Sequence, residues 1–311
     1  MIKISSNQKK TSNTFSYLWS DNKVYENATK KEIKLHLNES DRKSKGYVKK
    51  FLKSYFFKIS NRNKIRFLDL GCGYGYTFSI IFKNYITKIN YFGIDLISNL
   101  KKTKLFLIKR FKKNNFNPTL IKISMNDPKI KKLKPFDLVW AEGSIHHSES
   151  IESAIKNVSK IIKRKGFFMF WIINEQKPLR KITDKFFREY YKKISFKDQM
   201  NESFQIALLA NKFGKQLKNK KIKINKSIKS LGITAGNYRL QEILYDYIIK
   251  FFYNKLTTIK RNKHQIFDWF SPRFYHQTNK RNLLRLLNKY KFKISFYHQT
   301  TNGHTVIAKK L

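Results

Sequence analysis

The chain has 311 residues, and its 41% hydrophobic and 15% aromatic content excludes a disordered polypeptide. The charged start of the sequence, MIKISSNQKK, predicts no secretory signal, and the longest apolar run, Phe167–Ile173, is too short to span a membrane. The single cysteine, Cys72, excludes an internal disulfide and a metal site of several cysteines. These features lead us to expect a cytoplasmic protein with no membrane span.

The formal net charge of +47 has two explanations. Dense Lys and Arg neutralise phosphates, which suits a nucleic acid partner. The same composition is expected from an AT-rich genome, whose codons favour Lys, Asn, Ile and Phe. Of the 67 basic residues 12 are arginine, the better reader of phosphates and bases, and the lysines extend from Lys3 to Lys310. We therefore favour compositional drift, with a nucleic acid as the alternative partner.

Residues 1–60 are assigned to an N-terminal helical and aromatic cap segment, in which the apolar spacing of YVKKFLKSYFF, at 47–57, predicts a helix. From 61 to 176, the short apolar runs KIRFLDL, YFGIDL, FDLVWAE and GFFMFWII are separated by stretches of crossover length. Such runs are typical of a parallel sheet with helices on both faces. The predicted fold class is therefore α/β, with a doubly wound Rossmann-like sheet, and 61–176 form its ligand-binding core.

The first of these runs leads straight into three glycines, in the motif DLGCGYG at Asp69–Gly75. Glycines let the backbone turn sharply and approach a ligand without a Cβ in the way. The next run ends at Asp95, and adjacent strand ends meet at the ligand crevice of such a sheet. A carboxylate there suits both hydroxyls of a ribose. A dinucleotide site shares this logic but carries G-x-G-x-x-G, whereas Tyr76 stands here in place of the third glycine.

Residues 177–265 are interpreted as a helical lid insertion, with amphipathic patterns such as LQEILYDYIIKFFYNKL at 240–256. No strand is expected between these helices, although KNKKIKINKSIK, at 218–229, is ambiguous. Residues 266–311 form a return segment and then the runs KFKISFYHQ and HTVIAKK, joined by a turn. Two strands joined so tightly must be antiparallel, so a C-terminal β-hairpin completes the core.

Residues 15–310 resemble class I S-adenosylmethionine-dependent methyltransferases, through DLGCGYG, YFGID, FDLVWAEGSIHHSE and SKIIKRKGFFMFWI. FSYLW, at 15–19, and IFDWFSPRFYHQT, at 266–278, resemble the bacterial enzymes of small-molecule or cell-surface metabolism. The resemblance implies S-adenosyl-L-methionine as cofactor, with one carboxylate near its amino group, one at the ribose and an acidic station beside the adenine. The residues placed in the cofactor site are Trp19, Asp69, Gly71, Cys72, Gly73, Gly75, Asp95, Leu96, Asn126, Asp127 and Glu142.

Methyl transfer from a sulfonium is an in-line displacement, so alignment supplies much of the catalysis and a general base helps a hydroxyl acceptor. His146 and His147 follow the fourth core strand and are candidates for that base, with His147 preferred. The alternative is that one histidine caps the next helix and the other packs. A second group of candidates crowds one short loop after the insertion, where it either contacts substrate or packs: Asp268, Arg273, Tyr275 and His276. The remaining histidines lack metal-ligand spacing, so no metal site is predicted.

Motifs that the chain lacks narrow the acceptor. Methylation of base amino groups commonly uses an Asn/Asp/Ser-Pro-Pro-Tyr/Phe motif after the fourth strand, where this chain has AEGSIHH. Methylation of pyrimidine carbon-5 needs a cysteine near that position, and Cys72 lies elsewhere. The favoured function is methyl transfer to a small-molecule, sugar or lipid-linked acceptor. The alternatives are an RNA methyltransferase that uses the basic surface, and a cofactor-binding regulatory protein without transferase activity.

Overall fold

The computed structural model of the protein describes residues 4–21, 23–28, 30–60, 63–217, 219–251, 253 and 257–311. The chain divides into two compact units. The first unit consists of Met1–Glu26, His36–Asn174 and Arg273–Leu311, and the second of Asn27–Leu35 and Glu175–Pro272. All residues predicted to bind the cofactor or to take part in catalysis belong to the first unit, apart from the loop candidate Asp268.

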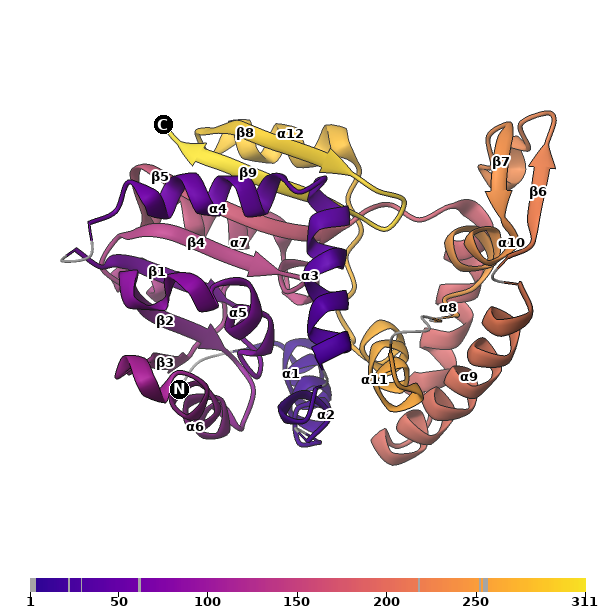
Figure 1. Ribbon diagram of the computed structural model, residues 1–311, viewed down its shortest axis with the longest axis horizontal. Coiled ribbons are helices and arrows are strands. Elements are labelled where there is room, and N and C mark those ends of the chain that lie inside the picture. Colours follow the sequence, from indigo (N-terminus) through magenta and orange to yellow (C-terminus); the bar gives the residue numbers. More distant parts are fainter. Residues whose placement is uncertain are drawn as a thin grey trace. The chain divides into compact units, whose positions relative to one another are not determined.

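A seven-stranded sheet in the order β3-β2-β1-β4-β5-β9-β8 forms the centre of the first unit (Figure 1). β1 to β5 are parallel, whereas β9 is antiparallel to both of its neighbours. The strands are β1 (Ile65–Leu70), β2 (Ile89–Asp95), β3 (Thr119–Lys122), β4 (Phe136–Glu142), β5 (Ile162–Ile173), β8 (Phe292–Gln299) and β9 (Gly303–Lys310). This confirms the doubly wound sheet and its C-terminal hairpin. β3 was not predicted, because an edge strand of four residues carries little apolar pattern.

Helices cover both faces of this sheet (Figure 1). Because successive side chains of a strand point to opposite faces, Phe67 packs into one buried layer and its neighbour Leu68 into the other. The helix predicted at 47–57 is confirmed. The helices of the first layer are α4 (Tyr47–Phe57), α5 (Tyr76–Ile81) and α6 (Leu100–Arg110), and those of the second are α7 (Ile151–Ile161) and α12 (Lys280–Lys289).

Three helices precede α4: α1 (Ser6–Leu18), α2 (Lys23–Glu26) and α3 (Lys30–Ser44). α1 begins after Ser5, whose hydroxyl accepts the N–H of Gln8, as an N-cap does. The chain passes from α3 into α4 through Lys45 and Gly46, both with left-handed φ angles. Short 3-10 turns complete this unit: η1 (Lys83–Lys88), η2 (Lys112–Asn114), η3 (Pro128–Lys132) and η4 (Ile145–His147).

The second unit is mostly helical but contains a two-stranded hairpin. Its elements are α8 (Pro178–Lys192), α9 (Phe196–Leu217), β6 (Lys221–Ile224), η5 (Lys229–Leu231), β7 (Gly236–Arg239), α10 (Leu240–Ile243), the π-helix η6 (Leu244–Ile248) and α11 (Ile259–Phe270).

Two predictions for this unit were wrong. The alternating KIKI at 221–224 forms an antiparallel strand with β7, where no strand was expected. The helix predicted at 240–256 ends at Ile248, and of its later positions 252 and 254–256 lie outside the described residues. Among the residues that the structure describes, no helix is both long and apolar enough to cross a membrane. The role of this insertion as a lid stays a prediction.

Candidate active site

The glycine motif forms a tight turn at the carboxyl end of β1. The N–H groups of Gly71 and Cys72 both donate to the carbonyl of Ile94, at 2.9 and 3.1 Å, which ties the turn to the end of β2. Gly71 has a left-handed φ of 78°, and a Cβ there would lie 2.4 Å from the Cβ of Ser144. Backbone strain and lack of space therefore both require glycine at this position.

Asp95, at the end of β2, is tied to the same turn. One carboxylate oxygen accepts the N–H of Gly73 at 2.8 Å, and the other accepts those of Leu96 and Ile97 at 2.7 and 3.1 Å. Burial raises the pKa of Asp95, and these three hydrogen bonds oppose that rise. The carbonyl of Leu96 in turn accepts the hydroxyl of Ser12, at 2.7 Å, so α1 is joined to this strand end.

Asp69 is the buried carboxylate of the turn. Its Oδ2 accepts the hydroxyl of Tyr91 at 3.0 Å. Burial raises the pKa of Asp69 to about 7; the hydrogen bond from Tyr91 opposes this effect, and the negative charge of Asp95 adds to it. A carboxylate that is hard to ionise in this environment becomes a good partner for a cationic ligand group, which would restore the ionised form.

Aromatic side chains lie against the outer side of the turn. A Cβ at Gly73 would lie 3.2 Å from the ring of Trp19, so the ring approaches the bare backbone closely. Trp19 packs on Tyr25, with ring centroids 4.9 Å apart, and Tyr25 packs on Tyr76 at 5.3 Å. The turn, two carboxylates and an aromatic cover fit S-adenosylmethionine, whose amino group, ribose hydroxyls and adenine need such partners.

Three other residues predicted to bind the cofactor make contacts within the protein. The side-chain amide of Asn126 donates to the carbonyl of Ser150 at 2.7 Å and accepts the N–H of Glu149 at 2.9 Å. Asp127 accepts the N–H of Lys129 and so caps η3. Cys72 is buried, and its sulfur would lie 3.0 Å from a Cβ at Gly93. Their places beside the cofactor stay predictions.

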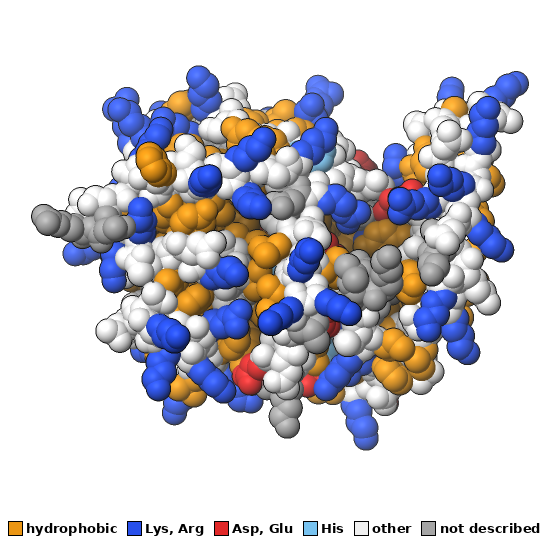
Figure 2. Space-filling view, in the orientation of Figure 1, with side chains coloured by type: hydrophobic (Ala, Val, Ile, Leu, Met, Phe, Trp, Pro, Cys, Tyr) orange, Lys and Arg blue, Asp and Glu red, His pale blue; other side chains and the backbone are white. Residues whose placement is uncertain are grey.

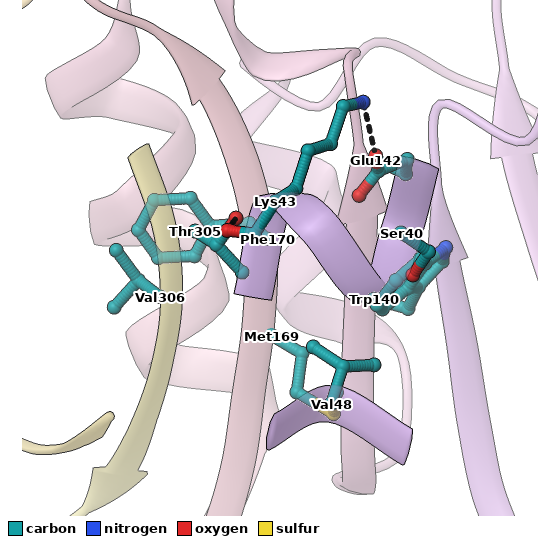
Figure 3. Close-up of a pocket in the computed structure, with 9 residues that line it drawn as sticks. All are labelled: Ser40, Lys43, Val48, Trp140, Glu142, Met169, Phe170, Thr305 and Val306. Atoms are coloured by element: carbon teal, nitrogen blue, oxygen red, sulfur yellow. Dashed lines mark hydrogen bonds and ion pairs between the residues drawn. The ribbon is translucent and has the colours of Figure 1, made fainter. Parts of the chain in front are cut away.

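Glu142, at the end of β4, contacts α3. Its carboxylate forms an ion pair with Lys43 at 3.0 Å (Figure 3). The ammonium of Lys43 lies 4.3 Å from the centre of the Trp171 ring. A small cavity, partly open to solvent, lies here and is lined by Ser40, Lys43, Val48, Trp140, Glu142, Met169, Phe170, Thr305 and Val306 (Figure 3). No sequence signal marks Lys43 as a partner, because it lies 99 positions away. The predicted contact of Glu142 with the cofactor is not tested by this ion pair.

The two candidate histidines lie next to the glycine turn, after β4. The hydroxyl of Ser144 donates to the carbonyl of Leu70, which holds the start of η4 against the end of β1. His147 is buried, and its Nδ1 lies 2.8 Å from the carbonyl oxygen of Phe274. Because a carbonyl only accepts, Nδ1 carries the proton, and Nε2 is the basic nitrogen of the neutral ring.

The return segment runs beside these histidines. The N–H of His276 donates to the carbonyl of His146 at 2.9 Å. The ring of Tyr275 lies 6.4 Å from the rings of both His146 and His147, whose centroids are 4.2 Å apart. α1 closes the cluster, since the ring of Phe15 contacts His147 at 4.9 Å. The four residues predicted to be catalytic are therefore neighbours in the first unit.

The other two candidates from this segment, Asp268 and Arg273, belong to different units. Asp268 lies within α11, in the second unit, so its expected place in a loop was wrong. Burial raises its pKa to about 7, and Arg188 opposes the rise. Arg273 begins the return segment in the first unit. Within the described part of the chain, no group of three or more His, Cys, Asp or Glu side chains is arranged to hold a metal ion.

Comparisons with known proteins agree with this geometry. The family model for a methyltransferase domain matches residues 68–168. No curated protein matches the chain. The structure resembles magnesium protoporphyrin IX methyltransferase from Synechocystis PCC 6803 with bound SAH, with a TM-score of 0.52 and 10% identity over 98% of this chain and 100% of that chain. The same enzyme with bound SAM gives a TM-score of 0.50 and 8% identity over the whole of both chains.

An O-methyltransferase family protein from Burkholderia thailandensis is also similar, with a TM-score of 0.42 and 7% identity over 84% of this chain. This chain spans 55% of that protein's length. At these identities the likeness to solved structures concerns the fold. The matched domain contains the glycine turn, Asp95 and the histidine pair, within the sheet that this fold requires. Residues 68–168 thus match a methyltransferase domain, and the sheet around them has the fold of class I S-adenosylmethionine-dependent methyltransferases.

Proposed function

We propose that this methyltransferase methylates a hydroxyl group of a small-molecule, sugar or lipid-linked acceptor, with His147 as the general base. The observation that carries the proposal is the hydrogen bond from Nδ1 of His147 to the carbonyl of Phe274, at 2.8 Å. It sets the tautomer in which Nε2 is the nitrogen that takes up a proton.

Bound S-adenosylmethionine supplies a methyl group that is already activated on a sulfonium. His147 accepts the proton of the acceptor hydroxyl at Nε2 as the oxygen becomes methylated. Tyr275 and His276 hold the acceptor in line, because their segment is fixed to His146 by a backbone hydrogen bond. The buried state of His147 keeps bulk water from competing for the proton.

We assign the cofactor to the other side of this cluster. Asp69 pairs with the amino group of the cofactor, Asp95 accepts the ribose hydroxyls, and the ring of Trp19 covers the turn. The backbone of the glycine turn supplies the close approach, since Gly71 and Gly73 have no Cβ in the way. The remaining predicted contacts are Cys72, Gly75, Leu96, Asn126, Asp127 and Glu142.

The second unit is proposed to act as a lid over the acceptor. Its larger part, Glu175–Pro272, is inserted between β5 and the return segment, and both ends of this part join the first unit at one place. Asn174 forms a parallel bridge with Thr278, and the N–H of Thr278 donates to the carbonyl of Ile173 at 3.2 Å. Both connections thus start beside the segment that carries Tyr275 and His276, so closure would act on that segment.

The acceptor class is tested by transfer of a labelled methyl group. The protein is incubated with S-adenosylmethionine labelled in the methyl group and with the low-mass, lipid and RNA fractions of a bacterial extract. We expect label in the low-mass or lipid fraction, in a product that resists mild base as an ether does. Label confined to RNA would overturn the proposal. Basic side chains are spread over the visible face rather than gathered in one patch, which favours the small acceptor (Figure 2).

A further inference from the structure

α8 carries a stripe of large apolar side chains on its exposed face. Ile182 and Phe186 are each 66% exposed, and Tyr190 is 41% exposed. The three are spaced four residues apart, so they lie one above the other on one side of the helix. The opposite side packs into the second unit through the buried residues Arg180, Asp184 and Tyr191. α8 therefore carries an apolar stripe on its outer side, whereas its inner side holds the buried ion pair between Arg180 and Asp184.

The grouping distinguishes this stripe from other exposed apolar residues. Phe57 of α4 is 87% exposed, and Leu105 and Ile108 of α6 are 59% and 37% exposed, but neither helix has three such residues in a row one turn apart. Single exposed residues of this kind are ordinary in proteins, whereas a contiguous apolar patch marks an interaction surface. The neighbouring helix α9 adds exposed Leu209 and Phe213, again four residues apart.

Lysines border the stripe. Lys181, Lys185, Lys192 and Lys193 are all exposed. Glu189 pairs with Lys192 at 2.5 Å. Figure 2 shows hydrophobic and basic side chains next to one another over the region of α8 and α9. A helix that lies on an anionic membrane typically places aromatic and aliphatic side chains in the bilayer interface. Lysines beside them lie at the level of the headgroups.

We propose that the α8 face (Ile182, Phe186 and Tyr190 with their flanking lysines) docks on the surface of a bilayer that contains anionic phospholipid. A second copy of this chain is a poorer occupant, because a symmetric contact would bring the same lysines face to face. A nucleic acid would contact the lysines but leave the apolar side chains in water. The inference goes beyond the proposed function, since docking does not depend on the acceptor.

Vesicle co-sedimentation of the full chain tests the proposal, with phosphatidylcholine vesicles compared with vesicles of equal parts phosphatidylcholine and phosphatidylglycerol. We expect at least about tenfold tighter binding to the anionic vesicles, because several lysines each contribute near a charged surface. Ile182→Ser combined with Phe186→Ser should weaken that binding by about tenfold or more, because two apolar side chains that docking would bury in the bilayer are lost. The matched control, Phe57→Ser combined with Leu105→Ser, should bind as the wild type does.

Equal binding of the stripe variant and the wild type would overturn the proposal, because charge alone would then explain the attraction. A wild-type protein that does not bind the vesicles would also overturn the proposal. The same holds if the stripe variant loses self-association while its vesicle binding is unchanged. Calorimetric affinity for S-adenosylhomocysteine shows that the variants are folded. Labelled methyl transfer to the low-mass fraction reports on the proposed function separately, so either idea can fail without the other.

Discussion

The two sides of the active site differ in how the chain builds them. The centre of the cofactor side, from Asp69 to Asp95, comes from one stretch of chain, where the N–H of Gly73 donates to the carboxylate of Asp95, 22 positions later. The catalytic side joins His147 to Phe274, 127 positions apart, with most of the second unit in between. One side is a local motif held by backbone hydrogen bonds, and the other is assembled by long-range contacts. The two should therefore respond independently to mutation.

The largest effect is expected on the catalytic side. His147→Ala removes the proposed base and should lower turnover roughly a hundredfold or more. Cofactor affinity should stay at the wild-type value, because no cofactor group is assigned to this ring. His298→Ala, in β8, is the control for loss of a histidine elsewhere. Steady-state kinetics measure the change, and wild-type turnover in His147→Ala would remove the general base from the mechanism.

The cofactor side should show the converse. Asp95→Ala leaves the N–H of Gly73 without its acceptor and removes the proposed ribose contact, so affinity for the cofactor should fall by about 1–3 kcal/mol. Glu152→Ala, which removes an exposed ion pair with Lys289, is the control and should change nothing measurable. Calorimetry checks both. An unchanged affinity in Asp95→Ala would take this carboxylate out of the site.

The pH dependence of cofactor binding sharpens the role of Asp69. In the free protein its pKa is about 7, so the carboxyl is mostly protonated at pH 6 and mostly ionised at pH 8. A cationic amino group binds the ionised form, so affinity should rise roughly tenfold between these pH values. Asp69→Asn should bind the cofactor more weakly and lose this pH dependence. Titration of the ligand itself affects both proteins equally, so the comparison of the two profiles removes it. Identical pH profiles for the two proteins would contradict the assignment.

The same shift has a consequence for stability. The folded-state pKa of Asp69 lies above its ordinary value of 3.8, so the folded state binds a proton more tightly than the unfolded chain. The stability that this proton provides is present below about pH 4 and is lost as the pH rises through about 7. Asp268 should act in the same direction from the second unit. Thermal unfolding of Asp268→Asn should therefore show its gain over the wild type above pH 7 and little gain near pH 4.

The smallest effect is expected for Cys72→Ala. The sulfur packs against Gly93, and the turn is proposed to bind the cofactor through its backbone. Cofactor affinity should change by less than about 0.5 kcal/mol, while unfolding should become easier by about 1 kcal/mol from the lost packing. Calorimetry and denaturant titration measure the two quantities. A large loss of affinity would mean that this side chain, and not only the backbone, contacts the cofactor.

Features that depend on local sequence could be predicted, whereas features that depend on distant segments could not. The strands β1, β2, β4 and β5 are readable because both of their faces are buried, which leaves continuous apolar runs. The glycine turn is readable because left-handed backbone at Gly71 and Gly73 requires a particular residue. β3 and the β6–β7 hairpin were not predicted, because short strands with exposed residues lack an apolar pattern.

Long-range partners are not readable in the same way. The ion pair between Lys43 and Glu142 and the hydrogen bond from His147 to Phe274 depend on how distant segments meet. A lysine in a chain with so many lysines gives no sign of such a role. The crowding of polar residues in one segment brought Tyr275 and His276 into consideration, but their place beside His146 comes from the return of the chain to the sheet.

If the two sides of the site have separate tasks, calorimetric titration with S-adenosylhomocysteine should separate them. Wild type, His147→Ala and Asp95→Ala are titrated side by side at pH 8. We expect equal affinity for the wild type and His147→Ala, and an affinity lower by about 1–3 kcal/mol for Asp95→Ala. Weakened binding in His147→Ala together with wild-type binding in Asp95→Ala would contradict this separation of tasks.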